Sequence, residues 1–184
     1  ADSGATAYVT NFDATVGRVY KVNTATMTVA NVISMPGVFM LKTHGARLSH
    51  DGKYLYVSAN ASDNVTVIRT SNDSIVTQIR VVNDGRVVSA DYLPYQIAVR
   101  GDDSFIYVTL NGNSAALGGR GYVSVIRRSG DSFTLLDTIR VGDRPLQCEV
   151  TKDQRYLYVC NQGSGSVSVI DAQTNRLVTT ILNV

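Results

Sequence analysis

The amino-acid sequence predicts an all-β protein that repeats one small antiparallel unit. β-Branched residues dominate the 184-residue chain, which holds 26 Val, 17 Thr and 10 Ile. These side chains favour extended, half-buried backbone and lose rotamer freedom in helices. A tyrosine-led segment also recurs four times at a nearly constant spacing, and no window has an apolar periodicity that favours a helix over a strand.

The last three repeats each contain four extended segments in a fixed order, and the first repeat contains three of them. The tyrosine-led segments start at Tyr8, Tyr56, Tyr107 and Tyr158, which are 48, 51 and 51 residues apart. A Val- and Ile-rich segment follows each one, at 17–22, 64–68, 122–126 and 166–170. A third segment comes next, at 27–33, 75–81, 133–141 and 177–182. A fourth precedes the last three tyrosine-led segments, at 39–49, 95–100 and 146–151, and Asp-containing hairpin turns connect the two.

Four short strands in each period of ~50 residues are typical of β-propeller blades. A parallel β-helix would have a shorter period, and an immunoglobulin-type sandwich would not repeat itself in this way. The sequence therefore predicts one propeller, or a propeller segment, over residues 1–184, with four-stranded antiparallel blades at about 1–37, 38–85, 86–142 and 143–184. The first blade lacks a segment for its inner strand, so that the chain supplies about 3.75 blades.

Three motifs carry a family resemblance: Tyr8-Val9-Thr10-Asn11, the Asp-Gly-Lys-Tyr-Leu-Tyr-Val run at 51–57 and the Ser-Val-Ser-Val-Ile-Asp run at 166–171. They resemble the YVTN family of β-propellers, over essentially the whole chain. The resemblance implies a propeller fold and relatives among archaeal surface-layer proteins and periplasmic or secreted bacterial propellers. Similar propellers occur in lactonases, quinone-dependent dehydrogenase subunits and haem-d1 nitrite reductases, so the fold by itself does not assign a function.

An arc of 3.75 blades would expose an apolar sheet face at each end and an unpaired strand edge in the first blade. Such surfaces favour association with another copy or with another propeller segment, as a closed ring or a filament according to the rotation between neighbours. Two alternatives remain open at this point. The chain could be a fragment of a longer propeller, or a four-bladed fold in which N-terminal residues replace the missing strand.

Composition and short motifs indicate which classes of partner and which cellular location the sequence favours. The net charge of +2 does not favour nucleic acid as a partner. No apolar stretch reaches the ~18 residues that a membrane span needs. Three Asn-x-Ser/Thr sequons, at Asn60, Asn64 and Asn72, are candidate glycosylation sites. With the family resemblance, they predict an extracellular, cell-surface or periplasmic location.

Cys148 and Cys160 are the two cysteines of the chain. They stand at equal distances from Gln154 in a predicted hairpin, which would place them opposite each other and allow a disulfide if that register holds. The alternative is two small buried thiols.

Catalytic motifs are not found. The sequence contains no Gly-x-Ser-x-Gly and no zinc or EF-hand spacing, so we expect no metal site, no cofactor and no enzymatic activity. His44 aligns with Tyr95 and Leu146 at the entrance of the inner strand, where it could bind a ligand or merely pack. Two lengthened connections, at 83–93 and 111–121, are either binding loops on one rim or tolerated insertions. The candidate ligand- or partner-binding residues are His44, Asp84, Arg86, Asp91, Tyr92, Tyr95, Asn113 and Arg120.

The sequence thus favours a non-catalytic, surface-layer-like structural or interaction protein that assembles through its incomplete terminal blade. Two alternatives stay open. One is a fragment of a propeller enzyme, either lactonase-like or a quinone-dependent dehydrogenase subunit. The other is a glycan- or peptide-binding module, with cell-surface glycans as its ligands.

Overall fold

The computed structural model describes residues 4–13, 15–35, 42–81, 92–112 and 120–184, and these form fifteen strands in four antiparallel sheets. The first sheet contains β1 (Thr6–Thr10), β2 (Arg18–Asn23) and β3 (Thr28–Ser34). The second contains β4 (Thr43–Leu48), β5 (Tyr54–Ala59), β6 (Asn64–Arg69) and β7 (Ser74–Arg80). The third contains β8 (Pro94–Val99), β9 (Phe105–Leu110), β10 (Gly121–Ser129) and β11 (Ser132–Val141). The fourth contains β12 (Pro145–Val150), β13 (Tyr156–Asn161), β14 (Ser166–Asp171) and β15 (Arg176–Leu182).

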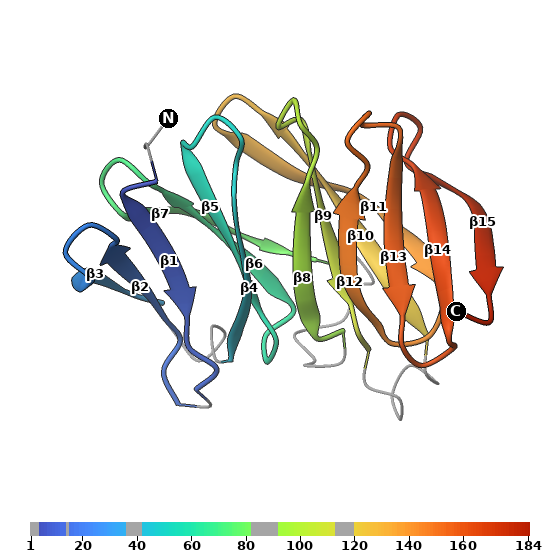
Figure 1. Cartoon of the computed structure of the whole chain (residues 1–184), viewed down its shortest axis with the longest axis horizontal. Coiled ribbons are helices and arrows are strands. Elements are labelled where there is room, and N and C mark those ends of the chain that lie inside the picture. The colour runs from blue at the N-terminus through green and yellow to red at the C-terminus, as the bar shows by residue number, and fades with distance from the viewer. Residues whose placement is uncertain (1–3, 14, 36–41, 82–91, 113–119) are drawn as a thin grey trace.

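The sheets follow one another in chain order, from the first at the left of Figure 1 to the fourth at the right. Within each sheet, every strand pairs with its chain neighbours. The strands β4, β8 and β12 lie beside one another and form the inner edge of the second, third and fourth sheets, while β1 occupies the edge of the first. The all-β, four-stranded propeller architecture is thus confirmed, including a first sheet without its inner strand.

Irregular pairing recurs at one position of the repeat. In all four sheets the register between the last two strands shifts by one residue. The shifts lie at Lys21/Val22, Val67/Ile68, Val125/Ile126 and Val169/Ile170. A bulge of this kind bends the strand and increases its twist. The repeated bulge therefore gives each blade the same curvature.

Apolar clusters fill the three seams between adjacent sheets. We call the face that a sheet turns toward the next sheet its trailing face, and the opposite one its leading face. In the seam between the third and fourth sheets, Tyr107 and Val125 of the trailing face pack with Leu157 and Ile170 of the leading face. All four side chains are buried, and the other two seams contain equivalent clusters. Each blade is therefore stabilised mainly by its neighbours.

The hydroxyl in the tyrosine-led motif connects one sheet to the next. Three equivalent hydroxyls donate to carbonyls of the following inner strand: Thr10 Oγ1 to His44 O (2.7 Å), Ser58 Oγ to Tyr95 O (2.7 Å) and Thr109 Oγ1 to Leu146 O (3.0 Å). The repeated Tyr-Val-Thr pattern therefore has two physical roles. The tyrosine fills the seam, and the residue two positions later satisfies a carbonyl across it.

Candidate functional site

His44 and Tyr95, two of the predicted binding residues, are in direct contact. His44 stands near the start of β4 and Tyr95 near the start of β8, so the closeness of these two inner strands brings the rings together. The ring centroids lie 3.7 Å apart with an interplanar angle of 34°. Gly45 allows this approach, because a Cβ at that position would lie 2.4 Å from Tyr95 O.

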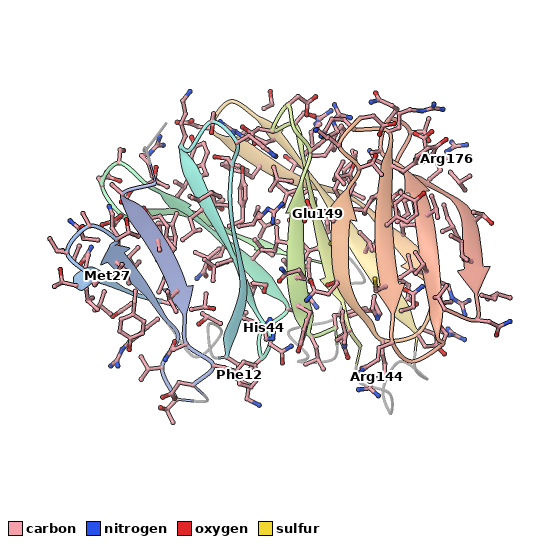
Figure 2. All side chains as sticks on the ribbon, in the orientation of Figure 1. Phe12, Met27, His44, Arg144, Glu149 and Arg176 are labelled. Carbon is pink, nitrogen blue, oxygen red and sulfur yellow. The ribbon has the colours of Figure 1, made fainter. Side chains whose placement is uncertain are left out.

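Phe12 completes an aromatic cluster around His44. Its ring meets the imidazole edge-on, with centroids 5.7 Å apart and an interplanar angle of 89°, and Figure 2 places both residues at the same end of the sheets. Phe12 is 61% exposed, and the ammonium group of Lys42 lies 5.7 Å from its ring centroid. The sequence pointed to His44 and Tyr95 through their place in the repeat. Phe12 and Lys42 were missed because they lie in connections, where the repeat gives no alignment.

The surroundings of His44 favour the neutral imidazole. Burial lowers the pKa of His44 below its usual value, and the carbonyl of Tyr95 opposes that shift in part. Nδ1 is buried without a hydrogen-bond partner among the described residues. The cluster can stack a planar or apolar ring on Phe12 and offer a cation beside it. Among the described residues, the ring contacts of His44 are with Phe12 and Tyr95.

The other predicted binding residues do not join this cluster. Asp84, Arg86, Asp91 and Asn113 lie outside the described residues. Arg120 is exposed. The side chain of Tyr92 is buried in the seam between the second and third sheets, edge-on to Tyr122, and its role as a binding residue stays a prediction.

Asp63 explains the position of Tyr92. This buried carboxylate accepts hydrogen bonds from the backbone N–H groups of Tyr92 (3.1 Å) and Leu93 (3.3 Å). It therefore fixes the entrance to β8, next to Tyr95, from the preceding sheet. The sequence offered no signal for this role, because an Asp in a turn is expected to bond its own backbone.

The predicted pairing of Cys148 with Cys160 is wrong in register. Cys148 pairs with Val159, and Cys160 pairs with Gln147, because the hairpin is centred between Asp153 and Gln154 and not on Gln154. Because side chains alternate across a strand, the two sulfurs point to opposite faces of the sheet. Both cysteines are free: Cys148 is buried in the seam, and Cys160 is exposed on the trailing face.

The three sequon asparagines lie in the second sheet and differ in exposure. Asn72, in the turn between β6 and β7, is exposed and accepts hydrogen bonds from the backbone and side chain of Ser74. Asn60 and Asn64 are partly buried, and Asn64 Nδ2 donates to Ser62 O at 2.6 Å. Glycosylation at these positions stays a prediction.

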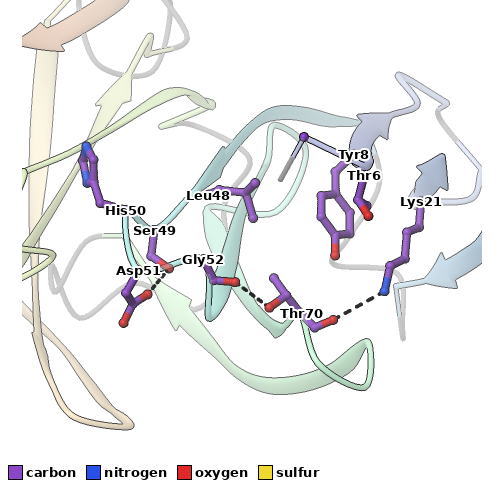
Figure 3. A pocket seen from close by; sticks show the side chains of 10 residues that line it. Thr6, Tyr8, Lys21, Leu48, Ser49, His50, Asp51, Gly52 and Thr70 are labelled. Atoms are coloured by element: carbon purple, nitrogen blue, oxygen red, sulfur yellow. Dashed lines mark hydrogen bonds between the residues drawn. The ribbon is translucent and has the colours of Figure 1, made fainter. Parts of the chain in front are cut away.

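A cavity of about 450 Å³ opens at the opposite rim, between the first two sheets. Figure 3 shows Tyr8 and Lys21 on one side and the turn from Ser49 to Gly52 on the other. The described part of the chain holds no cluster of three or more His, Cys, Asp or Glu residues that could bind a metal. A search of the same residues for a helix long and apolar enough to cross a membrane also finds none.

Comparison with known proteins decides the family. Residues 44–182 match the model of the choice-of-anchor I domain. The chain belongs to this family. The match includes the second, third and fourth sheets of this choice-of-anchor I domain, and it includes His44 and Tyr95. The narrower resemblance to YVTN repeats stays a prediction.

Relatives with longer chains support the propeller fold. The chain is 28% identical over 144 residues to the seven-bladed β-propeller protein Rv1057 of Mycobacterium tuberculosis, covering 73% of this chain and 31% of that one. Among solved structures, hydrazine synthase of Kuenenia stuttgartiensis has a TM-score of 0.75 at 22% identity, over 97% of this chain and 46% of that chain. A protein from Lactobacillus plantarum has a TM-score of 0.71 at 17% identity, over 97% and 56%. A functionally unknown protein from Desulfotomaculum acetoxidans has a TM-score of 0.68 at 12% identity, over 98% and 53%.

These structural likenesses show the fold alone. The choice-of-anchor I chain spans about half the length of the similar solved structures and about a third of the length of Rv1057.

Proposed function

We propose that this protein is a non-catalytic interaction module of the cell exterior that completes a propeller ring with a second copy of itself. Its membership of the choice-of-anchor I family supports a secreted or cell-surface location. The observation that carries the proposal is the chemistry of the two terminal sheet faces, which have the same kinds of residue that the internal seams bury.

The trailing face of the fourth sheet has apolar residues at the positions that the third sheet buries in a seam. Tyr158 and Ile181 occupy the repeat positions of Tyr107 and Ile139 in the third sheet. The internal pair is covered, with 0% and 8% of their surfaces exposed, whereas Tyr158 is 40% and Ile181 is 44% exposed. Contiguous apolar surface of this kind on a soluble protein usually marks an interface.

The residue two positions after the motif tyrosine gives a second example of a seam position that is exposed in the fourth sheet. Cys160 stands where Ser58 and Thr109 donate across a seam to the next inner strand. In the described chain, no fifth sheet follows, and Cys160 is exposed. On its trailing face the fourth sheet therefore has an exposed side chain at the position from which the second and third sheets donate a hydrogen bond to the next inner strand.

The leading face of the first sheet supplies a complementary surface. Ala7, Val9 and Val22 occupy the positions that Leu157, Val159 and Ile170 fill on the leading face of the fourth sheet. Val9 is 51% exposed. In addition, β1 pairs only with β2 among the described strands, and we propose that a strand of the second copy adds to its other edge.

A second copy is the partner that we propose for these two faces. The chain spans about half of the solved chains it resembles, and in the proposed dimer the second copy forms the rest of the ring. The contact joins a trailing face to a leading face, which is a heterologous interface. Such an interface closes when the accumulated rotation reaches a full turn.

Light scattering on the purified chain, with negative-stain imaging of the same sample, tests the proposal. We expect twice the chain mass and ring-shaped particles. Ile181→Asp on the trailing face and Val9→Asp on the leading face should each give monomers, because both junctions of the ring use both faces. Leu136→Asp is the matched control, since Leu136 is 49% exposed on β11 of an internal sheet.

Mixing the two variants separates a heterologous contact from an isologous one. Ile181→Asp retains an intact leading face and Val9→Asp retains an intact trailing face, so that an equimolar mixture should form one junction and a dimer. A wild-type chain that stays monomeric at high concentration would overturn self-association.

A further inference from the structure

The cavity between the first two sheets lies at a position that is filled in the other two seams. There an arginine side chain stacks on an aromatic ring, and we call this pair the plug. In the second seam, the guanidinium carbon of Arg128 stacks 4.6 Å from the ring centroid of Tyr54. In the third seam, Arg100 stacks at the same distance on Phe105 and donates from Nη1 to Ala172 O at 2.9 Å. The second and third seams thus each close their rim with an arginine lying on an aromatic ring.

Small residues replace this plug in the first seam. Thr6 occupies the repeat position of Tyr54, and Thr70 occupies that of Arg128. Gly52 stands where Asp103 accepts hydrogen bonds from the backbone of the preceding turn, at His50 N (2.7 Å) and Asp51 N (2.9 Å). Gly52 and Asp103 share the left-handed backbone conformation, with φ of 70° and 59°. Three substitutions to small side chains therefore open the same space.

The charged groups around the cavity are already neutralised. Lys21 Nζ lies 2.9 Å from Asp73 Oδ1 and 3.4 Å from Thr70 O. Asp51 is paired with Arg128 at 2.7 Å. The hydrogen bond to Asp73 raises the pKa of Lys21, so this cation remains with its partner. A charged ligand would have to displace one of these ion pairs, whereas a neutral one would not.

The walls combine apolar and hydroxyl surfaces. The ring of Tyr8 and the side chain of Leu48 border the cavity, and Figure 3 shows both among the polar side chains of Thr6, Ser49 and Thr70. A volume of about 450 Å³ lies within the range of small-ligand sites. A sugar ring has apolar faces and hydroxyl edges, which are the two kinds of surface that this cavity presents.

We propose that the seam between the first and second sheets is a binding site for a neutral sugar ring, which stacks on Tyr8 and hydrogen-bonds to the hydroxyl groups around it. The site lies at the opposite rim from the His44 cluster and does not depend on assembly of the ring. It exists because, among the described residues, no arginine fills the first seam. The ammonium group of Lys21 lies 5.9 Å from the ring centroid of Tyr8 and borders the cavity instead.

Titration of the full-length ¹⁵N-labelled chain with D-glucose, D-galactose, D-mannose and N-acetyl-D-glucosamine tests the site. We expect at least one sugar to give saturable amide shifts that include Tyr8 and Gly52. Glucuronate and glucosamine serve as charged probes and should bind more weakly than the neutral sugar. Binding of the charged probes alone would overturn the proposed ligand class, and absence of saturable shifts with all six would overturn the site.

Variants that rebuild the plug provide the structural control. Thr6→Tyr with Thr70→Arg copies the Tyr54 and Arg128 pair, and Gly52→Asp copies Asp103 without a clash, because a Cβ at Gly52 meets no atom within 4 Å. Both variants should stay folded and lose the sugar-dependent shifts. His44→Ala should keep them. Shifts that persist in a folded plug variant would overturn the proposal.

Discussion

Arg128 of the third sheet places a guanidinium nitrogen 2.7 Å from Asp51 Oδ2 of the second sheet. A second guanidinium nitrogen lies 3.6 Å from Asp103 Oδ2, and the side chain is only 9% exposed. The ring of Tyr54 covers one side of the cation, and the Asp103 carboxylate is buried, whereas the side chain of Asp51 is 31% exposed. Removing a buried cation is costly because the Asp103 carboxylate stays buried.

Removing this arginine should destabilise the protein strongly. Arg128→Ala leaves the buried Asp103 carboxylate without the guanidinium beside it and opens the rim of the seam, so we expect a loss of about 3 kcal/mol in the free energy of unfolding. Arg127→Ala is the matched control, since the neighbouring Arg127 is exposed, and it should change stability by less than about 0.5 kcal/mol. Urea unfolding measures both. Equal losses in the two variants would contradict the buried-pair interpretation.

The repeat pattern was enough to predict the fold, for a physical reason. Tyr56 and Tyr107 recur because each blade must fill an identical seam, so the sequence period and the structural period are the same. Register was harder to predict. The turn between β12 and β13 is centred between Asp153 and Gln154, so Cys160 pairs with Gln147 and not with Cys148, and a difference of one residue places the two side chains on opposite faces of the sheet.

The candidate site was predictable only where it follows the repeat. His44 and Tyr95 occupy equivalent positions on adjacent inner strands, and the structure brings them together. The sugar cavity depends on what is missing at Thr6, Thr70 and Gly52 relative to other blades. Such an absence has meaning only after the contacts of Arg128 in the second seam are known.

The hydroxyl of Thr109 should contribute more to the free energy of unfolding than the exposed thiol of Cys160, its counterpart in the fourth sheet. Thr109 Oγ1 donates to Leu146 O at 3.0 Å and accepts from Gln96 N at 2.9 Å. Thr109→Val leaves both groups unsatisfied in a buried seam and should cost about 1–3 kcal/mol. Cys160→Val, at the same repeat position, should cost less than about 0.5 kcal/mol in monomeric protein. A comparable loss in Cys160→Val would show that the inter-sheet hydrogen bond is not the cause.

Gly45 should not tolerate a side chain. An added Cβ would lie 2.4 Å from Tyr95 O and 3.1 Å from Ser58 Oγ, so Gly45→Ala must push β4 away from β8. We expect a loss of about 1–3 kcal/mol, together with changed NMR shifts for the His44 and Tyr95 rings. Gly163→Ala is the comparison, because its Cβ would meet Asp143 O at a milder 3.0 Å, and it should lose less than half as much. The reverse order would contradict the proposed close approach of the inner strands.

His44 should make the protein less stable in mild acid. Burial lowers its pKa in the folded state below the usual value of 6.5, so the unfolded chain binds the proton more readily. Stability should therefore be fully present above about pH 6.5 and decrease as the pH falls below that value. His44→Phe retains a ring between Phe12 and Tyr95 but cannot be protonated. The unfolding free energy of the wild type should then fall relative to that of His44→Phe between pH 7.5 and 5.5, a range that stays above the titration of most carboxyl groups. Two parallel pH profiles would show that His44 is not desolvated by its aromatic neighbours, and an NMR titration of its ring protons would locate the midpoint directly.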